Sequence, residues 1–306
     1  MALEWFTRHQ EADGRWSGRH FDDRCGDCAG PAQIDFDAAT TGMTLLCFLS
    51  AGHTHKTQGP YRERVDKALN WLAGRVDGSG DLRGRETMYS QTIGAVALCE
   101  AYAMTRDPAL EGPARRAVSF VVRGDGSRQN SRDTSVLGWQ IMAVKSAERC
   151  GFNISRASFE SAEKWLDRCA PRESPGRYGY SPGDRPGAAA SAEAMFVRQL
   201  LGHSRDEPRM RESAAFILAT PPQWRKGAPT YYWYYATLAL FQQQGDEWKR
   251  WNEGVVRELL ANQRREGAPA GSWDPTDEWS QLGGRIYQTA VCTLSLEVYY
   301  RYAPAR

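Results

Sequence analysis

The sequence of 306 residues lacks any apolar run of the roughly 18 to 20 residues that a membrane-spanning helix needs. It also has little net charge, because 39 lysines and arginines stand against 37 aspartates and glutamates, a balance of +2. A chain this close to neutral has no strong electrostatic attraction to nucleic acid or anionic lipid. The sequence therefore predicts no membrane span and no nucleic-acid partner. It favours a hydrophobic small molecule or a protein as partner.

The N-terminus, MALEWFTRHQ, lacks the apolar stretch of a secretory signal. A helical pattern begins there only a few residues before a turn, so the first helix looks cut short. We hypothesise that residues 1–306 form one toroid domain excised from a longer polypeptide, whose missing part held any targeting or anchoring segment. The sequence then gives no localisation.

A disulfide framework is also missing, since the seven cysteines are odd in number and scattered in spacing. Only Cys25 and Cys28 form a local pair, within HFDDRCGDC at 20–28. Together with a histidine such as His53, or with His20, Asp23 or His55, the pair has the residue types of a tetrahedral zinc site. A single Cys-x-x-Cys is a weak zinc signal, and zinc is not favoured here. The alternatives are reduced loop cysteines and a local disulfide.

Six apolar helical segments recur along the chain about 50 residues apart. A more charged helical segment precedes each of them, as at 61–73, 157–168 and 246–261. The apolar segments begin near Asp37, Tyr89, Asp133, Ala188, Tyr231 and Tyr287.

The contrast between the two kinds of segment predicts their positions. A helix that is apolar all round is enclosed, whereas one with a charged face lies at a surface. Six enclosed helices inside six charged ones make an all-α (α/α)6 toroid of six helical hairpins, with an apolar inner ring and a charged outer ring. Asp37 and Asp133 stand where N-cap residues of inner helices belong. An open solenoid is the alternative architecture.

Two short motifs point to a known family. The segment at 10–16, QEADGRW, has the pattern Gln-x-x-x-Gly-x-Trp, and a looser copy runs from Gln263 to Pro275. The pattern resembles the Gln-Trp repeat of squalene and hopene cyclases and related prenyltransferases. The resemblance implies that the glutamine and the tryptophan tie neighbouring hairpins together. It also implies a central apolar cavity that holds an isoprenoid or another hydrophobic ligand.

The catalytic acid motif of the cyclases, Asp-x-Asp-Asp-Thr-Ala, is eroded in this chain. The segment at 130–135, NSRDTS, keeps Asp133 but has Arg132 at the position of the proton donor, and arginine cannot act as that acid. The segment at 35–40, DFDAAT, keeps two acids. The resemblance therefore makes Asp37 the candidate donor and Asp35 its partner. An N-cap role is the alternative for Asp37 and Asp133.

Aromatic residues are concentrated in the inner segments, most densely in TYYWYY at 230–235. At 100° per residue, consecutive aromatics cannot share one face, so only one or two of them can point at the ring's axis. The others pack as core. We expect the ligand-binding set to be Tyr89, Asp133, Trp139, Tyr231, Trp233 and Tyr234. Plain core packing is the alternative role for its aromatic members.

These features favour a terpenoid cyclase-like or prenyltransferase-like toroid. The main alternative is a non-catalytic protein-interaction module of a larger protein. A carbohydrate-active enzyme is a third reading, because (α/α)6 rings also carry paired carboxylates for glycoside chemistry. The sequence singles out no second acid for such a pair.

Overall fold

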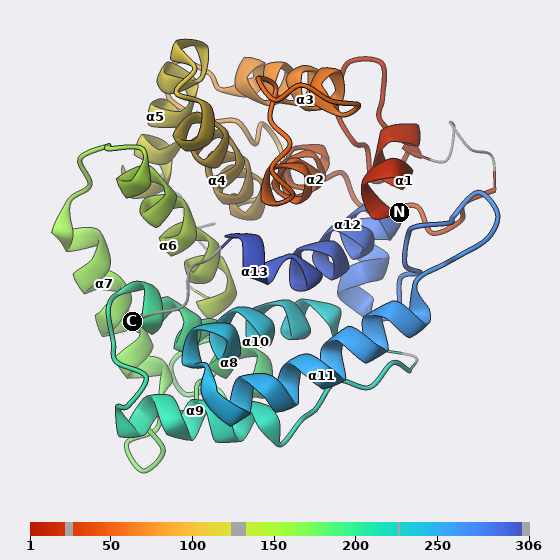
Figure 1. Cartoon of the computed structure of the whole chain (residues 1–306). Coiled ribbons are helices and arrows are strands. Elements are labelled where there is room, and N and C mark those ends of the chain that lie inside the picture. The colour runs from red at the N-terminus through yellow and green to blue at the C-terminus, as the bar shows by residue number, and fades with distance from the viewer. Residues whose placement is uncertain (22–26, 124–132, 226, 302–306) are drawn as a thin grey trace.

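The computed structural model describes residues 1–21, 27–123, 133–225 and 227–301. Within these ranges it contains helices and no strand (Figure 1). The inner helices are α2 (Asp37–Ser50), α4 (Met88–Thr105), α6 (Thr134–Arg149), α8 (Ala188–Leu200), α10 (Thr230–Gln243) and α12 (Glu278–Leu296). The outer helices are α1 (Ala2–Arg8), α3 (Arg62–Arg75), α5 (Pro108–Arg123), α7 (Arg156–Cys169), α9 (Pro208–Leu218) and α11 (Gly245–Asn262). A short helix, α13 (Val298–Arg301), follows α12.

The inner helices form a closed ring. Each one packs against the next in chain order, and α12 packs against α2. The predicted all-α (α/α)6 toroid is therefore confirmed, and the open solenoid is wrong. Five inner helices begin within one residue of the predicted starts. The sixth begins earlier than predicted, at Glu278, and is broken by a kink at Gly284, where φ is +75°.

Burial separates the two rings as the sequence predicts. In α2 every residue from Ala38 to Leu49 is buried, whereas α3 buries only Val65, Ala68, Leu69 and Leu72. The outer helices thus cover the inner ring with one apolar stripe each and leave their charged faces in water.

The N-cap predictions have different outcomes. The carboxylate of Asp133 caps α6 by accepting hydrogen bonds from the backbone N–H groups of Ser135 (2.7 Å) and Val136 (3.2 Å). Asp37 is not a cap, because it is already the first residue of α2. Its carboxylate forms an ion pair with Arg15 at 3.4 Å. The free N–H of Ala38 instead donates to the carboxylate of Glu86.

Both Gln-Trp segments make the same local hydrogen bonds. The indole N–H of Trp16 donates to the carbonyl of Phe6, and that of Trp273 donates to Leu259, each at 2.8 Å. In both copies this carbonyl lies four residues before the glutamine of the motif. The side chain of Gln10 also donates to the carbonyl of Arg64 in α3 at 2.8 Å, which joins the first hairpin to the second.

The glycine of the first Gln-Trp segment should be required for this packing. Gly14 has φ +100°, and a Cβ there would lie 2.4 Å from the carbonyl oxygen of Lys67 in α3. We expect Gly14→Ala to lower the free energy of unfolding by roughly 2 to 3 kcal/mol, because backbone strain and a backbone clash add. Gly52→Ala is the matched control, since Gly52 has φ +81° but open space around it. Gly52→Ala should lower the free energy of unfolding by only about 1 kcal/mol, as measured by urea titration. Equal losses would show that the contact with α3 is unimportant.

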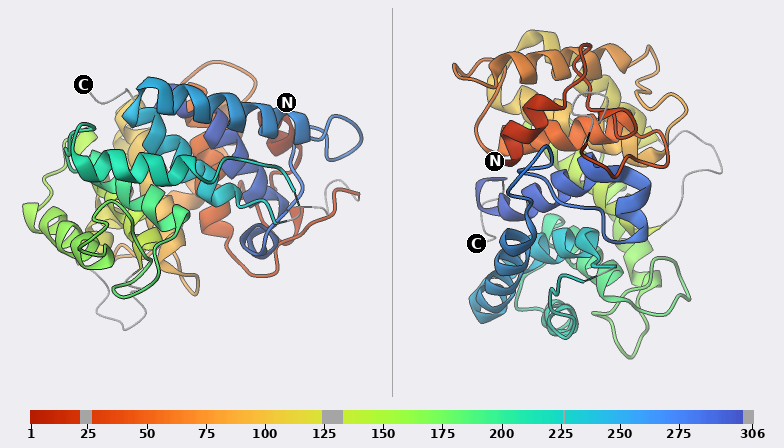
Figure 2. Two further views of the ribbon diagram at one scale, coloured as in Figure 1. Left: turned by 90° about the horizontal axis from the view of Figure 1, so that it is seen from below. Right: turned by 90° about the vertical axis from the view of Figure 1, so that its right-hand side faces the viewer.

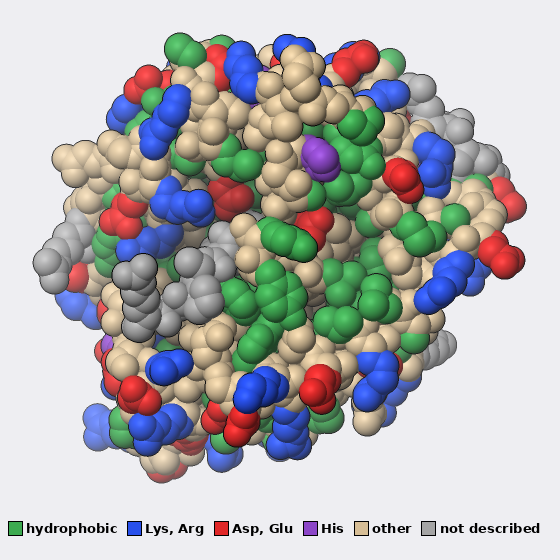
Figure 3. Space-filling model, in the orientation of Figure 1, with side chains coloured by type: hydrophobic (Ala, Val, Ile, Leu, Met, Phe, Trp, Pro, Cys, Tyr) green, Lys and Arg blue, Asp and Glu red, His purple; other side chains and the backbone are tan. Residues whose placement is uncertain are grey.

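The inner helices all run in one direction, so their N-termini gather on one face of the ring and α13 lies on the other (Figure 2). Figure 3 shows the α13 face, with hydrophobic side chains near its middle and charged ones around the rim. Tyr299 and Tyr300 of α13 are exposed there. None of the described helices is both long enough and apolar enough to cross a lipid bilayer.

Candidate functional site

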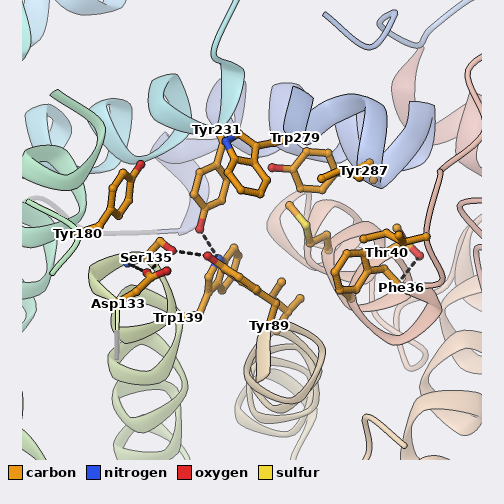
Figure 4. A pocket seen from close by; sticks show the side chains of 16 residues that line it. Phe36, Thr40, Tyr89, Asp133, Ser135, Trp139, Tyr180, Tyr231, Trp279 and Tyr287 are labelled. Carbon is orange, nitrogen blue, oxygen red and sulfur yellow. Dashed lines mark hydrogen bonds between the residues drawn. The ribbon is translucent and has the colours of Figure 1, made fainter. Parts of the chain in front are cut away.

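A cavity of about 240 Å³ lies at the centre of the ring, at the N-terminal ends of the inner helices. Most of its wall comes from the first turns of α2, α4, α6, α10 and α12 and from the residues just before them, and Tyr180 adds a loop residue (Figure 4). Trp279 and Ile34 are exposed at its rim. The remaining lining residues are Phe36, Ala39, Thr40, Met43, Tyr89, Ile93, Asp133, Ser135, Trp139, Tyr231, Leu282, Gly283 and Tyr287.

The polar groups of one wall bond mostly to each other. The hydroxyl of Ser135 donates to Asp133 at 2.5 Å, so the hydroxyl of Tyr89, which is hydrogen-bonded to Ser135, acts as the donor in that pair. The indole N–H of Trp139 donates to the hydroxyl of Tyr231 at 3.0 Å. Burial and the charge of Asp133 raise the pKa of Tyr89, so it stays protonated. With these polar groups engaged, the wall offers a ligand mainly apolar and aromatic surface.

The predicted ligand-binding residues divide into two groups. Tyr89, Asp133, Trp139 and Tyr231 line the cavity. Trp233 and Tyr234 do not, because the turn of α10 points them elsewhere. Trp233 packs against Trp224 with ring centroids 5.9 Å apart, and Tyr234 stacks on Trp139 at the same distance. Tyr234 thus supports the wall from behind, and Trp233 belongs to the core.

The predicted catalytic aspartates lie outside the cavity wall. Asp35 is exposed and sits 3.5 Å from Arg19, while Asp37 pairs with Arg15. Neither lines the cavity. Proton donation by Asp37 stays a prediction. Asp133, unlike Asp37, lines the cavity and could therefore contact a ligand in it.

A buried acid in the ring, Glu193 of α8, was not among the site residues expected from the sequence. Its side chain is fully buried, and neither carboxyl oxygen has a hydrogen-bond partner within the described part of the chain. Burial, and next the charge of Asp133, raise the pKa of Glu193 well above its ordinary value. Glu193 is therefore a neutral acid close to an aspartate of the cavity wall. A signal was present, because Glu193 is the only acid in the apolar segment AAASAEAMFV at 188–197.

The candidate metal ligands do not form one set. Cys28 is disulfide-bonded, and its Sγ lies 3.1 Å from Nε2 of His9. A disulfide sulfur is not the thiolate that zinc binds. Cys25 lies outside the described residues. His53 follows the C-terminal end of α2 and packs against Tyr61, with ring centroids 4.7 Å apart. Among the described residues, no group of three or more histidine, cysteine, aspartate or glutamate side chains is placed to hold a metal.

Comparisons with known proteins concern the fold. No protein-family model matches the sequence, and no curated protein matches it either. Among solved structures, the α-1,6-mannanase GH76A from a Salegentibacter species superposes with a TM-score of 0.63 at 15% identity, over 98% of each chain. A cellobiose 2-epimerase from Bacillus thermoamylovorans gives 0.66 at 12% identity, over 96% of this chain and 94% of that one.

A third solved structure is a variant of a type II terpene cyclase from Scytonema, in complex with geranylgeranyl dihydroxybenzoate. It gives a TM-score of 0.62 at 13% identity, over 98% of this chain and 95% of that one. Because such low identities show shared architecture alone, the chain has the α/α toroid fold that glycosidases, epimerases and terpene cyclases share.

Proposed function

We propose that this chain binds a hydrophobic small molecule, such as an isoprenoid, in the central cavity. The observation that carries the proposal is the wall itself, which combines apolar side chains and aromatic rings with polar groups that mostly bond to each other. At about 240 Å³ the cavity exceeds the roughly 150 Å³ of an apolar cavity that holds benzene. A ligand could extend beyond this volume at the rim, past Trp279.

Two further observations support a hydrophobic ligand over a sugar. Glycoside hydrolysis needs two carboxyl groups that both reach the substrate. Among the described lining residues, Asp133 is the only carboxylate, and Glu193 is fully buried without lining the cavity. In addition, a terpene cyclase of this fold holds an isoprenoid-bearing ligand. An interaction module, the alternative, would not need an apolar cavity.

Filling the cavity should weaken ligand binding. Ala39 lines the cavity from α2, so a phenyl ring introduced there would occupy ligand space. We expect farnesol to bind the wild type, and to bind Ala39→Phe at least tenfold more weakly, which corresponds to about 1.4 kcal/mol. Tryptophan fluorescence and native mass spectrometry would report binding. The control is Ala51→Phe at the exposed C-terminal end of α2, which should bind as the wild type does. Failure of the wild type to bind farnesol, or equal binding by Ala39→Phe, would contradict the proposal.

Catalysis calls for a separate experiment. The protein would be incubated with farnesyl diphosphate, geranylgeranyl diphosphate and squalene, and products would be sought by mass spectrometry. A product that disappears in Asp37→Asn identifies Asp37 as the proton donor. One that disappears only in Asp133→Asn assigns that role to the acid that lines the cavity. The lack of product from all three compounds favours binding alone.

A further inference from the structure

The cavity wall carries negative charge and no positive charge among its described residues. Asp133 lines it, whereas lysine, arginine and histidine are absent from the described lining. One oxygen of Asp133, Oδ1, accepts the hydrogen bonds from Ser135 and Val136. The other, Oδ2, receives no hydrogen bond from the described residues. Asp133 can therefore cap α6 and still present a carboxylate oxygen to a ligand.

A second acid lies near this wall. Glu193 is fully buried, and neither of its carboxyl oxygens has a partner among the described residues. Burial is the main cause that raises the pKa values of Tyr89, Tyr231 and Tyr287, and an ionised Glu193 would raise them further. These three tyrosines come from three different inner helices and all line the cavity. Because buried polar groups normally have partners, an unpaired acid beside a cavity needs an explanation. A positively charged ligand in the cavity would favour the ionised form of this acid, which burial disfavours when the cavity holds no cation.

The aromatic rings favour the same ligand charge. Seven of the described lining residues are aromatic: Phe36, Tyr89, Trp139, Tyr180, Tyr231, Trp279 and Tyr287. The faces of such rings attract cations, most strongly where water is excluded. Figure 4 shows the rings of Tyr180 and Trp279 on the side of the cavity opposite Asp133, whereas Tyr231 reaches Trp139 through a hydrogen bond. A ligand beside Asp133 would therefore meet a carboxylate on one side and aromatic rings on the other.

We infer that the ligand of this cavity is a hydrophobic ammonium compound, whose positive charge lies among the aromatic rings beside Asp133. This inference rests on the proposed function, since it specifies the charge of the hydrophobic ligand. The alkyl or aryl body packs against apolar residues such as Met43 and Ile93, and the charged nitrogen replaces its lost hydration with ring faces and Oδ2 of Asp133. A diphosphate head has no cationic partner in the described wall.

The test compares two probes of one shape. Phenyltrimethylammonium carries a charge, and tert-butylbenzene is its uncharged isostere. Each would be titrated into the full chain and followed by tryptophan fluorescence and ligand-observed NMR. We expect the wild type to bind the ammonium at least tenfold more tightly than the hydrocarbon. In Asp133→Asn the preference should fall to less than threefold, because the amide oxygen keeps the cap of α6 while the charge is lost. Asp246→Asn, at an exposed site in the first turn of α11, should keep the full preference.

The outcomes separate this inference from the proposed function. If the hydrocarbon binds as tightly as the ammonium, the cavity binds apolar ligands but the inference is wrong. The same conclusion follows if Asp133→Asn keeps the tenfold preference. If neither probe nor farnesol binds the wild type, the proposed function itself fails, and the inference fails with it.

Discussion

Arg198→Met should lower the free energy of unfolding by roughly 2 to 4 kcal/mol. Arg198 projects from α8 with only 1% of its side chain exposed. Its guanidinium pairs with Glu163 and Asp167 of α7, the latter at 2.6 Å, and donates to the hydroxyl of Tyr178 at 2.8 Å. Methionine would fill part of the space but leave the buried hydroxyl of Tyr178 without this partner. Because Glu163 and Asp167 are partly exposed, water can replace some of their interactions with Arg198. The decrease in the free energy of unfolding should therefore be smaller than for a fully buried ion pair.

The control for this prediction is Arg209→Met. Arg209 pairs with the same Asp167, at 3.3 Å, but one third of its side chain is exposed. Its removal should change the stability by less than about 1 kcal/mol. Urea titrations of both variants would measure the difference. Equal losses would mean that the buried position of Arg198 contributes nothing. Tyr178 lies two residues before Tyr180 of the cavity wall, so Arg198→Met should also weaken ligand binding.

The ring was predictable from the sequence because its cause is local. A helix without a polar face has to be enclosed, and segments such as TYYWYYATLALF show this directly. Two copies of the Gln-Trp pattern were also visible. The related glycines Gly80 and Gly176 were not recognised, although a Cβ at either would lie within 2.3 Å of an outer-helix carbonyl oxygen. Leucine and tyrosine take the place of the tryptophan after these glycines, at Leu82 and Tyr178.

The site was less predictable because long-range contacts define it. Asp37 and Asp133 look equivalent in the sequence, yet Asp133 caps its helix and Asp37 does not. The carboxylate that takes the capping role for α2 belongs to Glu86, 48 residues from its partner Ala38. Likewise, periodicity restricts how many of the aromatics at 231–235 can face the axis, but it does not say which. In the structure Trp233 packs on Trp224 and Tyr234 packs on Trp139, and this rotation of α10 leaves Tyr231 facing the cavity.

Glu193→Gln should change the pH dependence of stability. In the folded protein the pKa of Glu193 is well above 4.5, the ordinary value for a glutamate, because its charged form is desolvated. Above about pH 4.5 the unfolded chain releases this proton while the folded chain keeps it. The wild type therefore loses stability relative to Glu193→Gln as the pH rises, by about 1.4 kcal/mol per pH unit while Glu193 stays protonated in the fold.

Urea titrations of both proteins between pH 5 and pH 8 would test this slope. At the acidic end the variant should be the less stable protein, because its buried amide has unpaired donors. Its relative stability should then increase with pH. Glu266→Gln, at an exposed site, should show a difference from the wild type that does not depend on pH. A constant difference for Glu193→Gln as well would mean that the carboxyl is ionised in the fold. A rising difference would mean that the protein gives up stability at neutral pH to keep an acid beside its cavity, which is typical of residues retained for binding or catalysis.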